Sequence, residues 1–366
     1  MRVLVAPDKF KGTFTAAEAA AAIAEGVRLA RPEAECARLP LADGGEGTLE
    51  ALLAARGGKV RRLRVAGPMG ERVEAGYAVL STGEAVVETA LAAGLVLVPE
   101  EERDPERATT LGVGELIADA CERGARRVLV GLGGSATVDG GAGMAAALGF
   151  RLFDEEGRRL AGRASDLPRL AGIEEGDEVA DRLVGRTILT LCDVRNPLLG
   201  PEGAARVYGP QKGAGDEQVA RLERGLARLA EVAERDLGVP PGLKERPGAG
   251  AAGGLGWGVA ALLGGELREG ARFLLDAAGF DGALRGADLL LTGEGSWDLQ
   301  SAQGKAAAEA ARRAREAGVR VAILCARGEA GEGVFRGEDL PGGRGRLLER
   351  AGLVELARRA IMEIMA

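Results

Sequence analysis

The sequence predicts an α/β protein built from two domains, in which helices cover the faces of β-sheets. Its 366 residues are enough for two domains, each with a hydrophobic core. Apolar residues make up 46% of the chain and aromatic residues only 3%. A core rich in Ala, Val and Leu suits helix-on-sheet layers better than a β-sandwich. Short apolar strands also alternate with helical segments near both ends of the chain, which is typical of a doubly wound sheet.

The N-terminal segment predicts two strand–helix pairs. Residues 2–6 form a short apolar run, as expected of a buried strand. Thr13 or Thr15 can cap a helix over residues 16–30, where apolar side chains recur at helical spacing. The pair that follows comprises a strand over residues 36–41 and a helix near residues 48–56.

The alternation changes in the middle of the chain and returns near its end. Strands over residues 60–66, 72–79 and 84–90 are separated only by turns, so we expect them to pair antiparallel. Elsewhere we expect helices near residues 110–123, 142–148, 216–237, 304–317 and 350–365, helical stretches up to about residue 284, and strands over residues 126–132, 187–194, 287–293 and 319–326.

The similarity of the two ends predicts a discontinuous domain. Residues 1–66 and 285–366 are expected to form a doubly wound, Rossmann-like α/β domain, and residues 67–284 an inserted α/β domain with a mixed sheet. Ligands of such folds bind beyond the carboxyl ends of the strands. The active site is therefore expected in a cleft between the two domains.

Charge and composition exclude several functions. The net charge is −7 and both signs are interspersed, which disfavours binding to nucleic acid or to a membrane surface. No apolar stretch approaches the roughly 20 residues of a membrane span, and no signal peptide is recognisable, so a cytoplasmic protein is expected. The chain has no histidine, which excludes Ser-His-Asp and Cys-His catalysis. Acid–base chemistry must therefore use carboxylates, Lys, Tyr, Cys or water.

The few lysines point to sites of chemistry. Arg outnumbers Lys by 42 to 6, and four of the lysines, Lys9, Lys11, Lys212 and Lys305, lie in Gly-rich segments. In a chain that uses Arg so freely, a Lys indicates a site that needs a compact point charge. The only Asn, Asn196, also lies in a loop that follows a predicted strand.

Five loops combine glycines and carboxylates with Lys, hydroxyl or amide side chains, and a sixth loop is rich in glycine alone. Such loops present backbone N–H groups to anions. Phosphoryl transfer further needs Mg²⁺ on carboxylates, a positive charge near the moving phosphoryl group, and a group that orients the hydroxyl. The inventory therefore favours phosphoryl transfer, although turn formation alone could explain any single loop. The candidates, loop by loop, are Asp8, Lys9 and Lys11; Asp43, Gly44, Gly45 and Glu46; Gly133, Gly134, Ser135, Ala136, Thr137 and Asp139; Asp193, Asn196, Gln211 and Lys212; Gly253 and Gly254; and Glu294, Asp298 and Lys305.

One loop also allows an alternative function. Gly131-x-Gly133-x-x-Ala136 follows a strand and satisfies the dinucleotide-binding fingerprint, and Asp154 lies near the distance expected of a ribose-binding acid. An NAD-type dehydrogenase is therefore the alternative enzyme class. A Walker A motif is absent, because Gly304-Lys305 is followed by Ala306 and lacks the earlier Gly.

The loops, taken in order, resemble the signature segments of the type I glycerate kinases. That family carries blocks close to APDSFKGS, ADGGEGT, GTGELI, GLGGSATNDGG, CDVTNPL, FGPQKGA and PGAGAAGGLG, and then TGEG with a downstream GK. The matching blocks here extend from residue 1 to about residue 305. The resemblance implies ATP- and Mg²⁺-dependent phosphorylation of D-glycerate in a cleft between two α/β domains. Resemblance to the bacterial members favours 2-phosphoglycerate over 3-phosphoglycerate.

Two departures from the family pattern leave a catalytically weak binding homologue as a further alternative. After TGEG the chain reads SWDLQSAQGK where an Arg-x-Asp-x-Gln-Thr run is usual, and beyond about residue 320 the match weakens.

The residue types suggest individual roles. Asp193 is predicted to orient the hydroxyl, with Asp43 as base or metal ligand and Lys11 near the transferred group. Glu294 and Asp298 are the predicted metal ligands. Substrate or phosphate binding is assigned to Asp8, Lys9, Gly44, Gly45, Glu46, Asn196, Gln211, Lys212 and Lys305, and nucleotide binding to Gly133, Gly134, Ser135, Ala136, Thr137, Asp139, Gly253 and Gly254.

Overall fold

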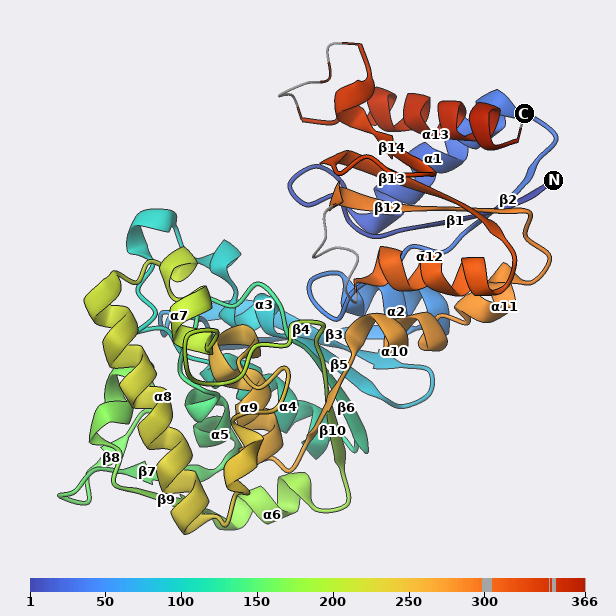
Figure 1. The fold of residues 1–366 in the computed structure, drawn as a ribbon. Helices are drawn as coiled ribbons and strands as arrows, with labels where there is room; N and C mark the ends of the chain where they lie inside the picture. The colour runs from blue at the N-terminus through green and yellow to red at the C-terminus, as the bar shows by residue number, and fades with distance from the viewer. Residues whose placement is uncertain (298–304, 342, 344–346, 366) are drawn as a thin grey trace. The chain divides into compact units, whose positions relative to one another are not determined.

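The chain folds into two compact α/β units (Figure 1). The structure is a computed structural model that describes residues 1–297, 305–341, 343 and 347–365. The first unit comprises residues 1–43, 50–55 and 269–366, and the second comprises residues 44–49 and 56–268.

The first unit is built on a five-stranded sheet in which all neighbouring strands are parallel, with the order β14-β13-β12-β1-β2. The chain moves from β1 to one side and then returns to β12 on the other side, so the strand order reverses between β1 and β12. In open α/β sheets this switch point is where ligands bind. The strands are β1 (Arg2–Pro7), β2 (Glu35–Arg38), β12 (Leu289–Trp297), β13 (Arg320–Gly328) and β14 (Val334–Arg336).

Helices cover both faces of this sheet, as the doubly wound prediction requires (Figure 1). Successive side chains of a strand point to opposite faces. Accordingly, Val3 and Val5 pack with α1 and α13, whereas Leu4 and Ala6 pack with α10, α11 and α12. The helices are α1 (Ala16–Ala30), α10 (Gly270–Ala277), α11 (Phe280–Leu284), α12 (Ala306–Glu316) and α13 (Arg350–Ile364).

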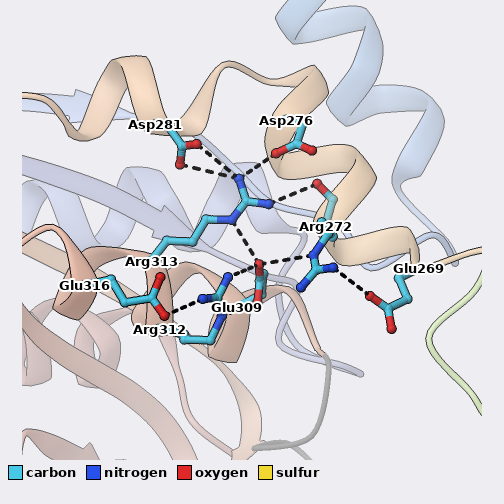
Figure 2. Close-up of polar contacts among 8 residues, drawn as sticks. All are labelled: Glu269, Arg272, Asp276, Asp281, Glu309, Arg312, Arg313 and Glu316. Carbon is cyan, nitrogen blue, oxygen red and sulfur yellow. Dashed lines mark hydrogen bonds and ion pairs between the residues drawn. The ribbon is translucent and has the colours of Figure 1, made fainter.

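An ion-pair network joins α10, α11 and α12 (Figure 2). Arg313, with a side chain only 11% exposed, lies 2.6 Å from Asp276, 3.4 Å from Asp281 and 2.9 Å from Glu309. Hydrogen bonds from Arg312 and then from Arg313 lower the pKa of Glu309 to about 2. The carboxylate of Glu309 therefore stays charged across the neutral and mildly acidic range.

The second unit contains a mixed six-stranded sheet with the order β11-β10-β6-β5-β4-β3. β5, β6, β10 and β11 run parallel, and the β3–β4 and β4–β5 pairs are antiparallel, as the turn-separated strands predicted. The strands are β3 (Gly58–Ala66), β4 (Arg72–Leu80), β5 (Ala85–Glu88), β6 (Arg127–Gly131), β10 (Thr187–Leu191) and β11 (Glu266–Arg268).

Helices and a small second sheet complete this unit around one large core that includes the fully buried Trp257. The small sheet has the order β8-β7-β9, from β7 (Phe150–Phe153), β8 (Arg159–Leu160) and β9 (Gly172–Glu175). In the described part of the chain, no helix has both the length and the apolar character that crossing a membrane requires. The helices are α3 (Thr89–Ala93), α4 (Leu111–Glu122), α5 (Ala142–Leu148), α6 (Asp177–Leu183), α7 (Ala204–Tyr208), α8 (Asp216–Asp236) and α9 (Ala251–Leu262).

The unit boundaries differ from those expected from the sequence, residues 66 and 285. β3 pairs along its whole length with β4, so it belongs to the sheet of the second unit. α10 and α11 contribute Leu275 and Phe280 to a core of the first unit, which therefore begins again at Glu269. A short helix, α2 (Thr48–Arg56), has residues assigned to both units.

Candidate active site

Asp8 occupies the switch point of the first sheet. It directly follows β1, and its N–H donates to the carbonyl of Gly293 in β12 at 2.9 Å. The residue is only 4% exposed, and its carboxylate accepts a hydrogen bond from the N–H of Lys9 at 2.7 Å. Burial, reinforced by the negative charge of Asp43, raises the pKa of Asp8 to about 8. The carboxyl group therefore holds its proton at neutral pH and can donate a hydrogen bond.

Lysine–carboxylate pairs lie at the same edge of the first sheet. Lys9 Nζ is 3.5 Å from Asp43 Oδ1, and Lys305 Nζ is 3.1 Å from Glu294 Oε2. Lys11 is exposed in the loop after β1. The structure thus places Asp8, Lys9 and Asp43 together, and Glu294 with Lys305. The predicted metal ligand Asp298 lies outside the described residues.

In the second unit, three loops meet through close backbone contacts at the carboxyl ends of β6 and β10. A Cβ on Gly44 would lie 2.8 Å from the Leu191 carbonyl, and one on Gly133 would lie 2.7 Å from Gly45 Cα. A Cβ on Gly134, whose φ is +62°, would overlap the Glu46 carboxylate. Glycine is therefore needed here for close approach, which explains why these loops are so rich in it.

Glu88 is a buried carboxylate at this edge that the sequence analysis missed. It ends β5, is 6% exposed, and its Oε1 accepts from the N–H of Leu49 at 2.6 Å. The next residue, Thr89, donates its hydroxyl to the Gly131 carbonyl at 2.9 Å. Glu88 thus links the first turn of α2 to the loop after β6. Its strand carries no Gly-rich motif, and only its position at a strand end could have drawn attention to it.

The loop after β6 presents backbone groups rather than side chains. Among the described residues, none accepts a hydrogen bond from the N–H groups of Gly133, Gly134 or Ser135. Gly133 and Gly134 are partly exposed, whereas Ser135 and Thr137 are 3% and 0% exposed. Unpaired backbone N–H groups in a glycine turn are a recurrent way of binding phosphate or carboxylate. Ala136 is buried as well, and its N–H donates to the Ala93 carbonyl at 2.8 Å.

Lys212 and Asp139, both predicted to contact ligands, are buried beneath this loop. Lys212 is 2% exposed, and its Nζ lies 2.9 Å from Ser135 Oγ and 2.7 Å from the Thr137 carbonyl oxygen. Burial lowers the pKa of Lys212 to about 7, an effect that the negative charge of Asp139 opposes. Asp139 is 0% exposed and accepts two hydrogen bonds of 2.8 Å from Thr110, and burial raises its pKa.

The polar side chains that follow β10 differ in whether they are open to a ligand or bonded within the fold. Asp193 is partly exposed just beyond the strand. The amide of Asn196 is engaged within the fold, because it accepts from the Tyr208 hydroxyl at 2.6 Å and donates to the Glu202 carbonyl at 2.7 Å. Gln211 is exposed. Of these residues, Asp193 and Gln211 are accessible to a ligand, whereas Asn196 stabilises its own loop.

A left-handed kink in α9 packs against the same region. Ala252, Gly253 and Gly254 have φ values of +51°, +71° and +90°. A Cβ on Gly253 would overlap the carbonyl oxygen of Thr137, and the Gly253 carbonyl accepts from the Gly140 N–H at 3.1 Å. Gly253 and Gly254 are buried and pack against Thr137 and Gly140 of the loop after β6.

Arg103 is a second residue that the sequence analysis missed. Its Nε is buried, and no described residue accepts a hydrogen bond from its side chain. Its backbone lies against Gly213, the residue after Lys212, since a Cβ there would be 2.6 Å from the Arg103 carbonyl oxygen. The nearby Asp104 and Glu106 instead bond Gln218. In a chain rich in Arg, nothing in the sequence marks this one.

The dinucleotide fingerprint lacks its structural context. β6 ends at Gly131, but α5 begins only at Ala142, so no helix starts at the glycine turn. Asp154 is bonded to Arg158 at 2.8 Å within the turn between β7 and β8. The structure therefore gives no support to the dehydrogenase alternative.

Comparisons with known proteins agree with this geometry. Residues 3–340 match the model of the glycerate kinase family. The chain is 44% identical over 306 residues to glycerate 2-kinase of Escherichia coli (83% of this chain, 80% of that protein). It is 43% identical over 316 residues to glycerate kinase of Bacillus subtilis (86% and 82%). The crystal structure of a protein assigned as glycerate kinase 2 from Salmonella typhimurium LT2 superposes with a TM-score of 0.83 at 38% identity, covering 100% of this chain and 98% of that one. The chain belongs to the glycerate kinase family.

This membership confirms the resemblance drawn from the Gly-rich loops, and the solved structure confirms the fold class of two α/β domains. It also extends beyond the block-by-block match, because the family model continues to residue 340. The divergent stretch after Gly295 therefore lies within a chain that matches the glycerate kinase family on both sides of it.

Proposed function

We propose that this protein transfers the γ-phosphoryl group of ATP to D-glycerate and forms 2-phosphoglycerate rather than 3-phosphoglycerate. The observation that carries the proposal is the glycine turn at residues 133–135, whose N–H groups have no acceptor among the described residues. In a member of the glycerate kinase family, a turn of this kind supports binding of a phosphate group.

Positively charged side chains of the first unit can bind the negatively charged glycerate and the phosphoryl group that is transferred. Lys9, Lys11 and Lys305 can neutralise the glycerate carboxylate or phosphate oxygens, and each is at least partly exposed. A protonated Asp8 can donate a hydrogen bond to an anion instead of repelling it. These features support an anionic substrate at the carboxyl ends of β1 and β12.

Proton transfer from the glycerate hydroxyl is assigned to carboxylates. Asp193 is proposed to orient the hydroxyl, because it is partly exposed directly after β10. Asp43, whose side chain is 29% exposed next to Lys9, is proposed to accept the proton or to bind the metal. General base catalysis of this kind contributes roughly 10²–10⁴-fold to a rate.

Mg²⁺ is proposed to bind together with the nucleotide. Among the described residues, no three Cys, Asp or Glu side chains are placed to hold a metal ion. Mg²⁺ in kinases is commonly held by one or two carboxylates together with substrate phosphates and water. The carboxylates that fit this arrangement are Asp43 and Glu294, each beside a lysine. When bound, the ion would neutralise charge on the phosphates.

The test is ADP release by the purified protein in a coupled assay with ATP, Mg²⁺ and D-glycerate, with L-glycerate and EDTA as controls. We expect turnover that requires both D-glycerate and Mg²⁺. Binding of ATP and glycerate by calorimetry without any product would instead identify a binding homologue. Absence of both binding and turnover in folded protein would refute the proposal.

A further inference from the structure

Lys212 contacts a loop that lies more than seventy residues away in the sequence. It ends a short 3-10 helix, Pro210–Lys212, between α7 and α8. Its Nζ bonds Ser135 Oγ at 2.9 Å and the Thr137 carbonyl oxygen at 2.7 Å. The Lys212 side chain therefore bonds to the loop after β6 at the residues on both sides of Ala136.

We propose that Lys212 is a positioning residue that holds residues 133–137 in the conformation that binds nucleotide phosphate, and that it does not contact the phosphate. The inference rests on the proposed function, because it concerns the phosphate site of that same reaction.

Burial excludes a direct contact between Lys212 and a ligand. The residue is 2% exposed, and two of the three ammonium donors are already directed to Ser135 and Thr137. Asp139 is fully buried nearby, and its charge opposes the lowering of the Lys212 pKa by burial. A buried ammonium group is tolerated when hydrogen-bond acceptors satisfy it, and here both acceptors belong to the loop after β6.

Backbone contacts also hold this loop, since the Leu95 N–H donates to the Gly134 carbonyl at 2.7 Å, and Lys212 adds the contacts to Ser135 and Thr137. The Ala136 N–H donates to the Ala93 carbonyl at 2.8 Å, and the Gly140 N–H donates to the Gly253 carbonyl at 3.1 Å. Without Lys212, the Thr137 carbonyl oxygen would be buried against Gly253 with no donor for it described. The N–H groups of residues 133–135, which have no acceptor in the described part of the chain, are the ones a phosphate needs.

The residue type supports this role. The chain has 42 arginines and only 6 lysines, yet a lysine stands at this buried position. A guanidinium group presents five donors in a rigid plane, whereas two acceptors on one loop need a compact group.

The experiment compares Lys212→Met, which keeps the length of the side chain but removes its donors, with Lys244→Met. Lys244 lies in the same unit and pairs with Glu234 at 2.8 Å, away from the loop's hydrogen bonds. We expect Lys212→Met to raise the KM for ATP by about tenfold or more, since hydrogen bonds from a charged donor are lost. The KM for D-glycerate should change by less than about threefold, and Lys244→Met should change neither.

Amide hydrogen exchange supplies a readout that does not require turnover. In Lys212→Met the amides of Ala136 and Gly140 should exchange about tenfold faster, while those of β6 keep their wild-type rates. Uniformly faster exchange that includes β6 would indicate general destabilisation, and Lys212→Gln, which keeps N–H donors, would then be used in the same comparison.

An unchanged KM for ATP together with unchanged exchange at Ala136 and Gly140 would overturn the inference. A kcat loss without any change in the KM for ATP or in exchange would instead assign Lys212 to the chemical step and equally contradict it. If the wild-type protein shows no turnover, the proposed function fails. The exchange data and calorimetric ADP binding would still decide the role of Lys212.

Discussion

Replacement of Gly253 by alanine tests the packing behind the glycine turn. With φ at +71°, an alanine there adopts a left-handed conformation, which costs about 1–2 kcal/mol. Its Cβ would also overlap the Thr137 carbonyl oxygen, which Lys212 holds in place at 2.7 Å. Overpacking of a fixed core typically costs a further ~1–3 kcal/mol. We therefore expect the free energy of unfolding of the second unit to fall by about 2–5 kcal/mol.

Gly264→Ala is the matched control. Gly264 has a φ of +63°, but a Cβ there would meet nothing within 4 Å. This variant should lose only the conformational part, about 1–2 kcal/mol. The difference between the two variants isolates the contact with Thr137.

Urea unfolding followed by tryptophan fluorescence measures the effect. The chain has two tryptophans, of which Trp257 lies in the second unit and Trp297 in the first. In a Trp297→Phe background the signal reports the second unit alone. If Gly253→Ala is no less stable than Gly264→Ala, the Thr137 carbonyl is free to move and the packing described here is wrong.

Three further predictions concern single charges. Burial, and after it the negative charge of Asp43, raises the pKa of Asp8 to about 8. At neutral pH the folded state therefore binds a proton that the unfolded state has released. As the pH rises from about 4 to about 8, wild type should therefore lose stability relative to Asp8→Asn in thermal unfolding. A pH-independent difference between the two proteins would contradict this. Arg313→Met should lower the free energy of unfolding by about 1–3 kcal/mol at neutral pH, less than a fully buried pair. Since the pKa of Glu309 is lowered to about 2, the stability lost in Arg313→Met should be constant above the usual pKa of a glutamate and shrink as the pH falls toward about 2. An equal loss at about pH 2 in urea titrations would refute the network. Arg103→Met should raise the KM for ATP or glycerate by about tenfold without lowering stability, because no described residue pairs with its guanidinium. The exposed control Arg107→Met should change neither the KM values nor stability. Unchanged KM values in Arg103→Met would show that Arg103 binds no substrate anion.

The strands and helices were predictable because their signals are local. The run before Pro7, the capped helix from residue 16 and the apolar segment 187–194, of which residues 187–191 form β10, each carry their own pattern of spacing and termini. The structure confirms that these segments are a strand, a helix and a strand. Local patterns do not reveal the partner of a strand. β3 was therefore expected in the discontinuous domain, although it pairs with β4.

The loops of the site were predictable from their glycines, but the direction of their side chains was not. The sequence places Lys212 and Asp139 in Gly-rich segments, as it does Lys9, yet the first two are buried and Lys9 is partly exposed. Whether a side chain is buried depends on segments distant in the sequence, such as α9 against the loop after β6. Glu88 was missed for the same reason, because only the paired strands show that it ends beside Gly131.

Product analysis by ³¹P NMR tests the central claim most directly. After incubation with ATP, Mg²⁺ and D-glycerate, we predict a new phosphate ester formed in equal amount to ADP. Its signal should be split into a doublet by the single proton on C2, as expected of 2-phosphoglycerate. A triplet from the two protons on C3 would contradict the regiochemistry. The absence of any new ester from folded protein would contradict the assignment of this chain as a glycerate kinase.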